Sequence, residues 1–263
     1  MNSIVCLKQV PDTEAQIRVK SDEIITEGVK FIINPYDEYG LEEALQQKEK
    51  AGSGEVTIVC LGPQRCVEAI RTGLAMGADK AVHLDDPAFD GSDALATAKV
   101  LAEQIKTMEY EIVFCGRQAV DDDQAQVGIA LAEYLGLPHA SLVTKVEVAE
   151  GKKSVKVNRQ IVGGEEILEM QLPCVLSAQK GLNEPRYASL PGIMKAKKKP
   201  LTPVKAADLG IDTGAVGAAG SKTRPGNYSS PAPRTAAKII TGESPEEKAA
   251  NLAKALREEA KII

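Results

Sequence analysis

The sequence contains very few aromatic residues and only two histidines. It has no tryptophan, and aromatic residues make up 3% of its 263 positions. The two histidines, His83 and His139, lie far apart, and neither has an obvious nucleophile beside it. Because a hydrolytic triad needs a nucleophile, a base and an orienting acid in one place, this pattern argues against a hydrolase.

Paired cysteines, long apolar runs and excess positive charge are also missing. The five cysteines form no CxxC pair, which predicts free thiols in a reducing cytoplasm and no metal site. No apolar run reaches the roughly 18 residues that cross a bilayer, and we expect no export signal at the N-terminus. Lys and Arg number 32 and Asp and Glu 37, so the net charge of −5 predicts no general attraction to nucleic acid.

The first 137 residues alternate short apolar runs with amphipathic stretches. The apolar runs are 3–7, 55–61, 81–84 and 111–115, and the helical stretches between them are 37–49, 63–75 and 92–105. Continuous apolar runs are typical of strands covered on both faces, so we predict an α/β fold with a doubly wound, mostly parallel sheet. Pro63 is expected at the first position of its helix. A further helix is expected to bury Val127, Ala130, Leu131 and Tyr134.

The pattern changes after Pro138. Residues 141–148, 154–160 and 166–171 alternate apolar and polar side chains between turn signals, which predicts an antiparallel hairpin region. Beyond Leu201 the chain becomes rich in Gly, Ala, Pro and Ser, as in a linker or arm. A capping box at Ser244 then predicts a C-terminal helix. We therefore divide the chain into an α/β domain, residues 1–200, and a C-terminal arm and helix, residues 201–263.

Three turns follow predicted strands and could together enclose one nucleotide. They span residues 34–37, 60–63 and 115–128. Ligands of open α/β sheets bind beyond the carboxyl ends of the strands, where helix N-termini offer N–H groups to phosphate. Gly116 permits a tight turn, and the small Ala125 lets the backbone approach a phosphate. The alternative is that Asp121–Asp123 only cap the next helix, since three carboxylates beside a phosphate repel it unless a cap, a cation or ribose hydroxyls engage them.

Residues 182–199 combine two prolines, several apolar side chains and a run of lysines. The prolines disfavour regular structure, so Tyr187, Leu190, Ile193 and Met194 have little prospect of burial. Exposed apolar side chains ringed by cations, of which Lys195 is the first, favour a docking surface. The alternative is a surface loop that Leu190 and Met194 pin to the core.

Several motifs resemble those of the electron transfer flavoprotein β-subunit family. They are KQVPD (8–12), NPYDEYGLEEAL (34–45), RTGLAMGAD (71–79), AVDDDQAQVG (119–128) and LNEPRYASLPGIMKAKKKP (182–200). The resemblance runs from residue 1 to about 205 and resumes around Pro233-Arg234-Thr235-Ala236. The last of the five motifs is highly specific.

The resemblance implies an adenine-nucleotide-binding α/β fold that pairs with an α subunit. One redox-active FAD is held mainly by that α subunit near the interface, and the β subunit buries AMP. The cofactor-binding residues implied by position are Cys6, Asn34, Pro35, Tyr36, Asp37, Leu61, Gly116, Ala119, Asp122, Ala125, Gln126 and Val127. Tyr36 is the aromatic residue expected near the flavin, and the phosphate is expected on the backbone around residues 125–127.

The resemblance also implies protein partners. Residues 178–199 match a recognition loop in which Leu190 inserts into a hydrophobic pocket of an acyl-CoA dehydrogenase, with Tyr187, Ile193, Met194 and Lys195 around it. The arm and C-terminal helix would then embrace the α subunit. The implied function is that of a cytoplasmic electron carrier without catalytic residues of its own, which passes electrons from the dehydrogenase to a membrane-associated quinone-reducing oxidoreductase.

Two alternatives remain at this point. Ala125 and Val127 replace the Asn and Thr common in respiratory members and resemble the electron-bifurcating branch, in which the β subunit holds a second FAD that exchanges hydride with NADH. The DDD string at 121–123 and the intact LNEPRY loop instead resemble respiratory members. From another class, a stand-alone nucleotide-binding regulator similar to universal stress proteins fits the first 137 residues but leaves the loop and arm unexplained.

Overall fold

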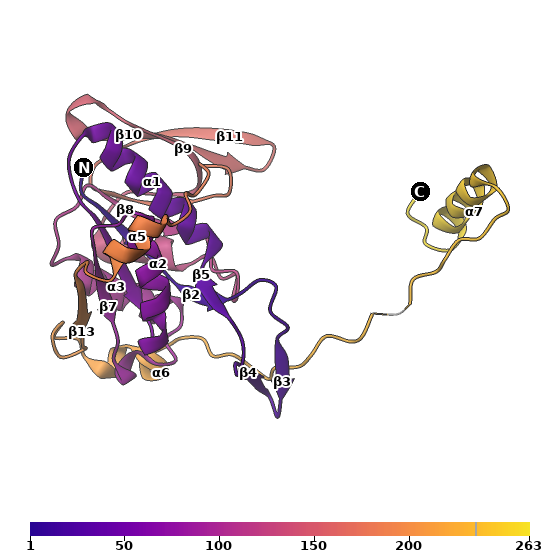
Figure 1. Ribbon diagram of the computed structural model, residues 1–263, viewed down its shortest axis with the longest axis horizontal. Helices are drawn as coiled ribbons and strands as arrows, with labels where there is room; N and C mark the ends of the chain where they lie inside the picture. Colours follow the sequence, from indigo (N-terminus) through magenta and orange to yellow (C-terminus); the bar gives the residue numbers. More distant parts are fainter. Residues whose placement is uncertain (235) are drawn as a thin grey trace.

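One nine-stranded sheet organises the chain (Figure 1). The computed structural model describes residues 1–234 and 236–263, so Thr235, within the second segment of the family resemblance, lies outside the described residues. The sheet has the strand order β11-β10-β9-β12-β8-β1-β6-β7-β13. The parallel strands are β1 (Ser3–Cys6), β6 (Val56–Leu61), β7 (Lys80–Leu84), β8 (Ile112–Gly116), β12 (Cys174–Ala178) and β13 (Leu201–Val204).

The remaining strands extend one side of the sheet and form two small ribbons. β9 (His139–Val148) runs parallel to β12. β10 (Ser154–Ile161) pairs antiparallel with β9, and β11 (Gly164–Gln171) pairs antiparallel with β10. β2 (Gln9–Pro11) pairs with β5 (Phe31–Ile33), and β3 (Arg18–Lys20) with β4 (Glu23–Ile25). These observations confirm the predicted α/β fold, its mostly parallel sheet and its hairpin region.

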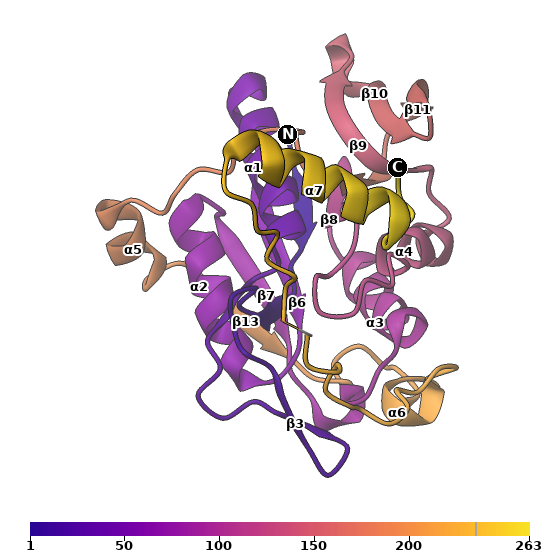
Figure 2. The ribbon, with the colours of Figure 1, turned by 90° about the vertical axis from the view of Figure 1, so that its right-hand side faces the viewer.

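Helices cover both faces of the sheet (Figure 2). α1 (Pro35–Ala51), α2 (Val67–Met76) and α5 (Leu190–Ala196) lie on one face, where Leu41, Ile70 and Leu74 pack with Val5 and Phe114. α3 (Ala94–Ile105) and α4 (Val127–Leu135) lie on the other, in a second hydrophobic cluster. Two-sided cover explains why the central strands are continuous apolar runs. Among the described helices, none is both long and apolar enough to cross a membrane.

Three local predictions were wrong. The two prolines of residues 182–199 were expected to prevent regular structure, but α5 forms there, because Pro191 lies in its first turn, where a helix tolerates proline.

The other two predictions concern single residues. Pro63 does not open α2 but precedes a short 3₁₀ turn (Gln64–Cys66), after which α2 begins at Val67. Tyr134 is 40% exposed instead of buried, because α4 turns Gly128 toward the sheet. A Cβ at Gly128 would overlap Ser177 Oγ and lie 3.4 Å from Cys115 Cβ, so the missing side chain lets α4 pack closely on the sheet here.

The chain continues on the sheet beyond residue 200 before it leaves the α/β body. β13 pairs with β7, and Ala206 and Val216 are buried near α6 (Gly217–Gly220). An extended segment then leads to α7 (Pro245–Glu258), which lies away from the body in Figure 1. Ser244 caps α7 by accepting a hydrogen bond from Glu247 N, as the capping box predicts.

His139, the first residue of β9, should make stability sensitive to acid. Its Nε2 lies 3.0 Å from Ser177 Oγ, and burial, with a smaller effect of Arg159, lowers its pKa to about 4. Between about pH 6.5 and pH 4, His139 is therefore protonated in the unfolded chain and neutral in the folded chain. The free energy of unfolding consequently falls as the pH falls through this window. We expect His139→Gln to reduce this loss by about 1 kcal/mol. Urea unfolding at pH 7 and pH 4.5 measures it, and an equal loss in both proteins would contradict the assignment.

Candidate functional site

The sheet has a topological switch point between β1 and β8. From β1 the chain proceeds outward through β6 and β7 on one side, whereas β8 and β12 lie on the other. Ligands of open α/β sheets bind in the crevice that this reversal leaves beyond the carboxyl ends of the strands. Here those ends are Cys6 and Gly116.

A cavity of about 410 Å³ opens at this switch point. Its wall contains the ends of β1, β6 and β8, the start of α3 and the loop that leads into α4. The structure brings together here the predicted residues Cys6, Asn34, Asp37, Leu61, Gly116, Ala119, Asp122, Ala125, Gln126 and Val127. A cavity of this size can hold a small organic ligand, since such sites span roughly 300–1,000 Å³.

Two predicted residues lie outside this cavity wall. Pro35 begins α1, where its fixed φ suits the first helical position. Tyr36 is half-buried and has the Arg117 guanidinium over its ring, 5.0 Å from the ring centroid. Arg117 itself lines the cavity, so Tyr36 contacts the wall from behind.

The wall also contains residues that the sequence analysis did not assign. They include Lys8 after β1, Arg65 after β6, and Phe89–Ala94 with Thr97 at the start of α3. The loop between β7 and α3 could have been predicted to line the cavity. β7 is another parallel strand, so the loop that follows it must open at the same edge of the sheet. Lys8 belongs to the KQVPD motif but carried no assigned role.

Asp37 connects three parts of the wall. Its carboxylate accepts hydrogen bonds from Lys8 N at 2.7 Å, Asn34 Nδ2 at 2.9 Å and Gly116 N at 3.0 Å. Burial raises the pKa of Asp37 to about 7, and these hydrogen bonds oppose that rise. The side chain thus ties the ends of β1 and β8 to the first turn of α1.

Asn34 ties the same turn to the loop after β8. Its Nδ2 donates to Gln118 O at 2.9 Å, and its Oδ1 accepts from Val120 N at 3.2 Å. The side chain is buried, with both of its polar atoms bonded. Asn34 therefore fixes the backbone of the loop 116–128 through these two hydrogen bonds.

Lys8 binds two of the three adjacent aspartates, which were expected either to cap α4 or to repel a phosphate. Its Nζ lies 2.8 Å from Asp121 Oδ1 and 3.0 Å from Asp122 Oδ2. Burial disfavours the charge on Lys8, but the bonds to these carboxylates outweigh it and raise the pKa. Asp123 instead lies close to Gln118 Nε2. The aspartates are therefore engaged by a cation and an amide and leave the helix N-terminus uncapped.

The N-terminus of α4 faces the cavity without a side-chain cap. Gln126 occupies the N-cap position and makes no capping hydrogen bond. Ala125, just before it, has a φ of 54°, a left-handed conformation that costs a residue with a side chain roughly 1–2 kcal/mol. A left-handed residue followed by a right-handed one turns successive N–H groups toward one point, where an anion can bind.

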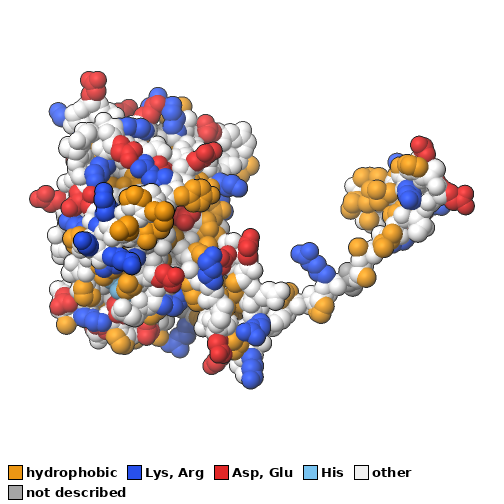
Figure 3. All heavy atoms as spheres, in the orientation of Figure 1, with side chains coloured by type: hydrophobic (Ala, Val, Ile, Leu, Met, Phe, Trp, Pro, Cys, Tyr) orange, Lys and Arg blue, Asp and Glu red, His pale blue; other side chains and the backbone are white. Residues whose placement is uncertain are grey.

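A second feature lies on the surface at α5, and we call residues 182–199 the α5 segment. Leu190 is 79% and Met194 73% exposed, and Tyr187 and Ile193 are also exposed. Lys195 lies exposed beside them. Figure 3 shows hydrophobic side chains gathered over α5. The alternative in which Leu190 and Met194 pin the segment to the core therefore fails.

The C-terminal helix is a third exposed apolar feature. None of the side chains in α7 is buried, and Leu252, Ile239 and Ile262 are exposed. Figure 3 shows hydrophobic side chains grouped on this helix. An amphipathic helix with an exposed apolar face is typical of a surface that packs on another element.

Comparison with known proteins agrees with these features. Residues 23–209 match the model of the electron transfer flavoprotein domain. The chain is 46% identical over 248 residues to the electron transfer flavoprotein subunit beta of Thermoanaerobacterium thermosaccharolyticum, covering 94% of each chain. It is 42% identical over 260 residues to the caffeyl-CoA reductase-Etf complex subunit CarD of Acetobacterium woodii, covering 98% of each. It is 44% identical over 216 residues to the subunit beta of Bos taurus, covering 81% of this chain and 84% of the bovine one.

These matches extend over nearly the whole chain, including the cavity wall and the α5 segment. The alternative of a stand-alone nucleotide-binding regulator explained only the first 137 residues, whereas these matches also include the α5 segment and the C-terminal arm. The sheet, the switch-point cavity and the sequence identity lead to the same conclusion. The chain belongs to the electron transfer flavoprotein family and is similar throughout to its β subunits.

Proposed function

We propose that this chain is the β subunit of a heterodimeric electron transfer flavoprotein and holds AMP in the switch-point cavity. The observation that carries the proposal is the uncapped N-terminus of α4 at the wall of that cavity. Its free N–H groups and helix dipole suit a phosphate group. Ala125, Gln126 and Val127 would hold the phosphate through their backbone, because their side chains carry no charge.

The redox group of the proposed heterodimer is an FAD held mainly by the α subunit. When bound, the flavin supplies the electron-transfer chemistry, and the protein supplies position and electrostatics. Tyr36 and Arg117 stack beside the cavity and are this chain's candidates for contact with that flavin. The exposed apolar face of α7 and the preceding arm would pack on the α subunit.

The α5 segment is the proposed contact with an electron donor. Leu190 would enter a hydrophobic pocket of an acyl-CoA dehydrogenase, with Tyr187, Ile193 and Met194 around it and Lys195 at the rim. Apolar anchors within a polar rim are typical of protein interfaces. The heterodimer would then pass electrons to a membrane-associated quinone-reducing oxidoreductase, and we expect it to act in the cytoplasm.

A second FAD in this cavity, exchanging hydride with NADH, is the second candidate. The uncharged, small side chains of Ala125 and Val127 favour it, because they leave room for a pyrophosphate. One relative, CarD, is named as a subunit of a caffeyl-CoA reductase-Etf complex. The cavity volume of about 410 Å³, near the lower end of the usual range, favours the smaller ligand, AMP.

Nucleotide analysis of the complex with its α subunit tests the proposal. Acid extraction and chromatography should give one FAD and one AMP per heterodimer. Val127→Asp should reduce the AMP to less than half, because a carboxylate beside the phosphate repels it. Val127→Ala is the matched control and should retain AMP. Two FAD per heterodimer would support the second candidate, and the absence of any adenine nucleotide would refute both.

A further inference from the structure

The α5 segment reverses the usual placement of polar and apolar side chains. Its apolar residues Tyr187, Leu190 and Met194 are exposed, whereas the polar side chains of Arg186 and Asn183 turn inward onto α1. Charged residues ordinarily remain in water and apolar residues leave it. The contacts of Arg186 and Asn183 with α1 therefore do not bury apolar surface but fix the position of the segment by hydrogen bonds.

Arg186 makes a dense set of hydrogen bonds to two glutamates of α1. Its Nε and Nη2 donate to Glu42 at 2.8 and 3.0 Å, and its backbone N donates to the same carboxylate at 3.1 Å. Its Nη1 and Nη2 donate to Glu49 at 2.6 and 3.1 Å. A planar guanidinium that engages two carboxylates fixes both its position and its orientation.

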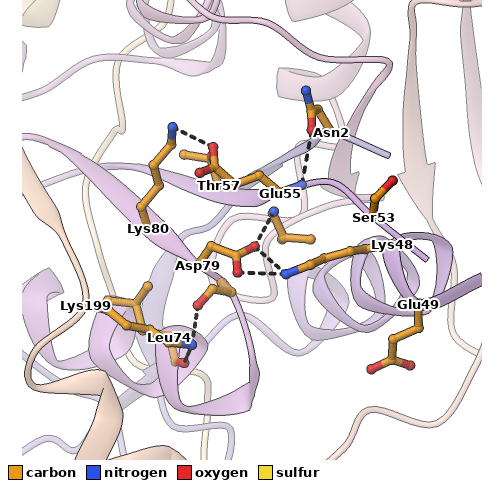
Figure 4. A network of polar contacts seen from close by, with 12 residues as sticks. Asn2, Lys48, Glu49, Ser53, Glu55, Thr57, Leu74, Asp79, Lys80 and Lys199 are labelled. Carbon is orange, nitrogen blue, oxygen red and sulfur yellow. Dashed lines mark hydrogen bonds and ion pairs between the residues drawn. The ribbon is translucent and has the colours of Figure 1, made fainter. Parts of the chain in front are cut away.

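Further contacts anchor the segment on both sides of α5. Asn183 Nδ2 donates to Tyr39 O and to Glu43 Oε2, each at 3.1 Å. At the other end, Arg71 Nη1 donates to Ala196 O at 2.6 Å. Lys199 Nζ donates to Leu74 O at 2.9 Å, next to the Lys48–Asp79 ion pair shown in Figure 4. The apolar face is therefore held between two polar anchors.

The Arg186 contacts differ in exposure. The side chain of Glu42 is 5% exposed and that of Glu49 59%. Burial alone would raise the pKa of Glu42, but hydrogen bonds from Arg186 and Gln46 outweigh it and lower the pKa. Both carboxylates therefore carry charge at neutral pH, and the cation of Arg186 is needed to balance the buried one.

We propose that Arg186 is a positioning residue, which holds Tyr187–Met194 in the docking conformation by bonding Glu42 and Glu49 of α1. This inference rests on the proposed role of the α5 segment in docking. A preformed surface loses little conformational entropy on association, so its partner binds more tightly. The anchors act before contact with the partner, and their residues are not part of the cavity wall.

The test uses the complex with the α subunit and an acyl-CoA dehydrogenase reduced by its own substrate. Arg186→Ala should raise the KM for the flavoprotein about fivefold, with kcat and nucleotide content unchanged, because the segment loses its preformed shape. Arg186→Lys should give a smaller rise, since lysine retains the charge but not the planar fork. In a Leu190→Ala background, Arg186→Ala should add less than it does alone.

Controls separate this inference from the function on which it rests. We call the Arg186 contacts with Glu42 and Glu49 the clamp. Glu49→Ala removes its exposed half without leaving a buried charge. This variant should raise the KM about twofold even if Arg186→Ala fails to fold. Lys106→Ala removes an exposed ion pair on α3, on the opposite face of the sheet, and should change nothing. A raised KM in Leu190→Ala with normal values in Arg186→Ala and Glu49→Ala would overturn the clamp alone. A normal KM in all of them would overturn the docking function as well.

Discussion

Replacing Leu190 with alanine should lower kcat/KM for the flavoprotein with an acyl-CoA dehydrogenase about 10- to 100-fold. Leu190 is 79% exposed in the free chain and projects from the first position of α5. Burying a leucine side chain in a partner contributes roughly 1.5–3 kcal/mol, which corresponds to this range. Steady-state electron transfer at varied flavoprotein concentration measures the effect.

The matched control removes an apolar side chain of similar exposure elsewhere. Val162, in the turn between β10 and β11, is fully exposed and lies outside the α5 segment. Val162→Ala should leave kcat/KM unchanged, and both variants should match the wild-type complex in flavin and adenine nucleotide content. An unchanged rate in Leu190→Ala would remove the docking role of the segment and leave the nucleotide proposal untouched.

Replacing Gly116 with valine should destabilise the protein by about 3 kcal/mol and abolish binding of the proposed adenine nucleotide. A Cβ at this position would overlap Asp37 Oδ1 and lie 2.7 Å from Tyr36 Cβ and 2.8 Å from Tyr36 C. Because the last of these is a backbone atom, a rotamer change cannot relieve the clash. The first turn of α1 would have to move and would break the Asp37 contacts with Lys8 N and Gly116 N.

Urea unfolding and nucleotide extraction of the purified complex measure this prediction. Gly164→Val is the control, because a Cβ on Gly164, the first residue of β11, would have no described atom within 4 Å. This variant should unfold at nearly the same urea concentration as the wild type and retain its nucleotide. Normal stability of Gly116→Val would show that the turn tolerates displacement and would contradict the close packing of Gly116 against Tyr36.

The strands that sequence patterns predicted are those with strong local signals. β1, β6, β7 and β8 are short apolar runs bounded by helical stretches, and their two-sided burial follows from that pattern. β13 was missed because it contains Pro203, which ordinarily argues against a strand. The proline is tolerated because β13 lies at the edge of the sheet, with β7 as its one neighbour among the described strands.

The candidate site was predictable in part for a similar reason. A turn after a parallel strand opens at the carboxyl edge of the sheet, so Leu61 and Gly116 could be grouped from sequence. The same reasoning was applied to Asn34, but β5 lies outside the large sheet and pairs antiparallel with β2, so Asn34 reaches the cavity from the start of α1 instead. The partner of the aspartates could not be grouped in this way, because Lys8 and Asp121 are separated by 113 positions. Only the adjacency of β1 and β8 brings them together.

The sequence by itself determined the alternation of strands and helices, the positions of the turns and the exposed apolar residues of the α5 segment. These properties depend on periodicity and composition within about 20 residues, the range over which a helix or strand buries one face. The tertiary structure decided which turns meet in one cavity, that Lys8 engages the aspartates, and that Arg186 bonds to α1. Those contacts depend on the order of strands in the sheet, which sets long-range distances that no local pattern contains.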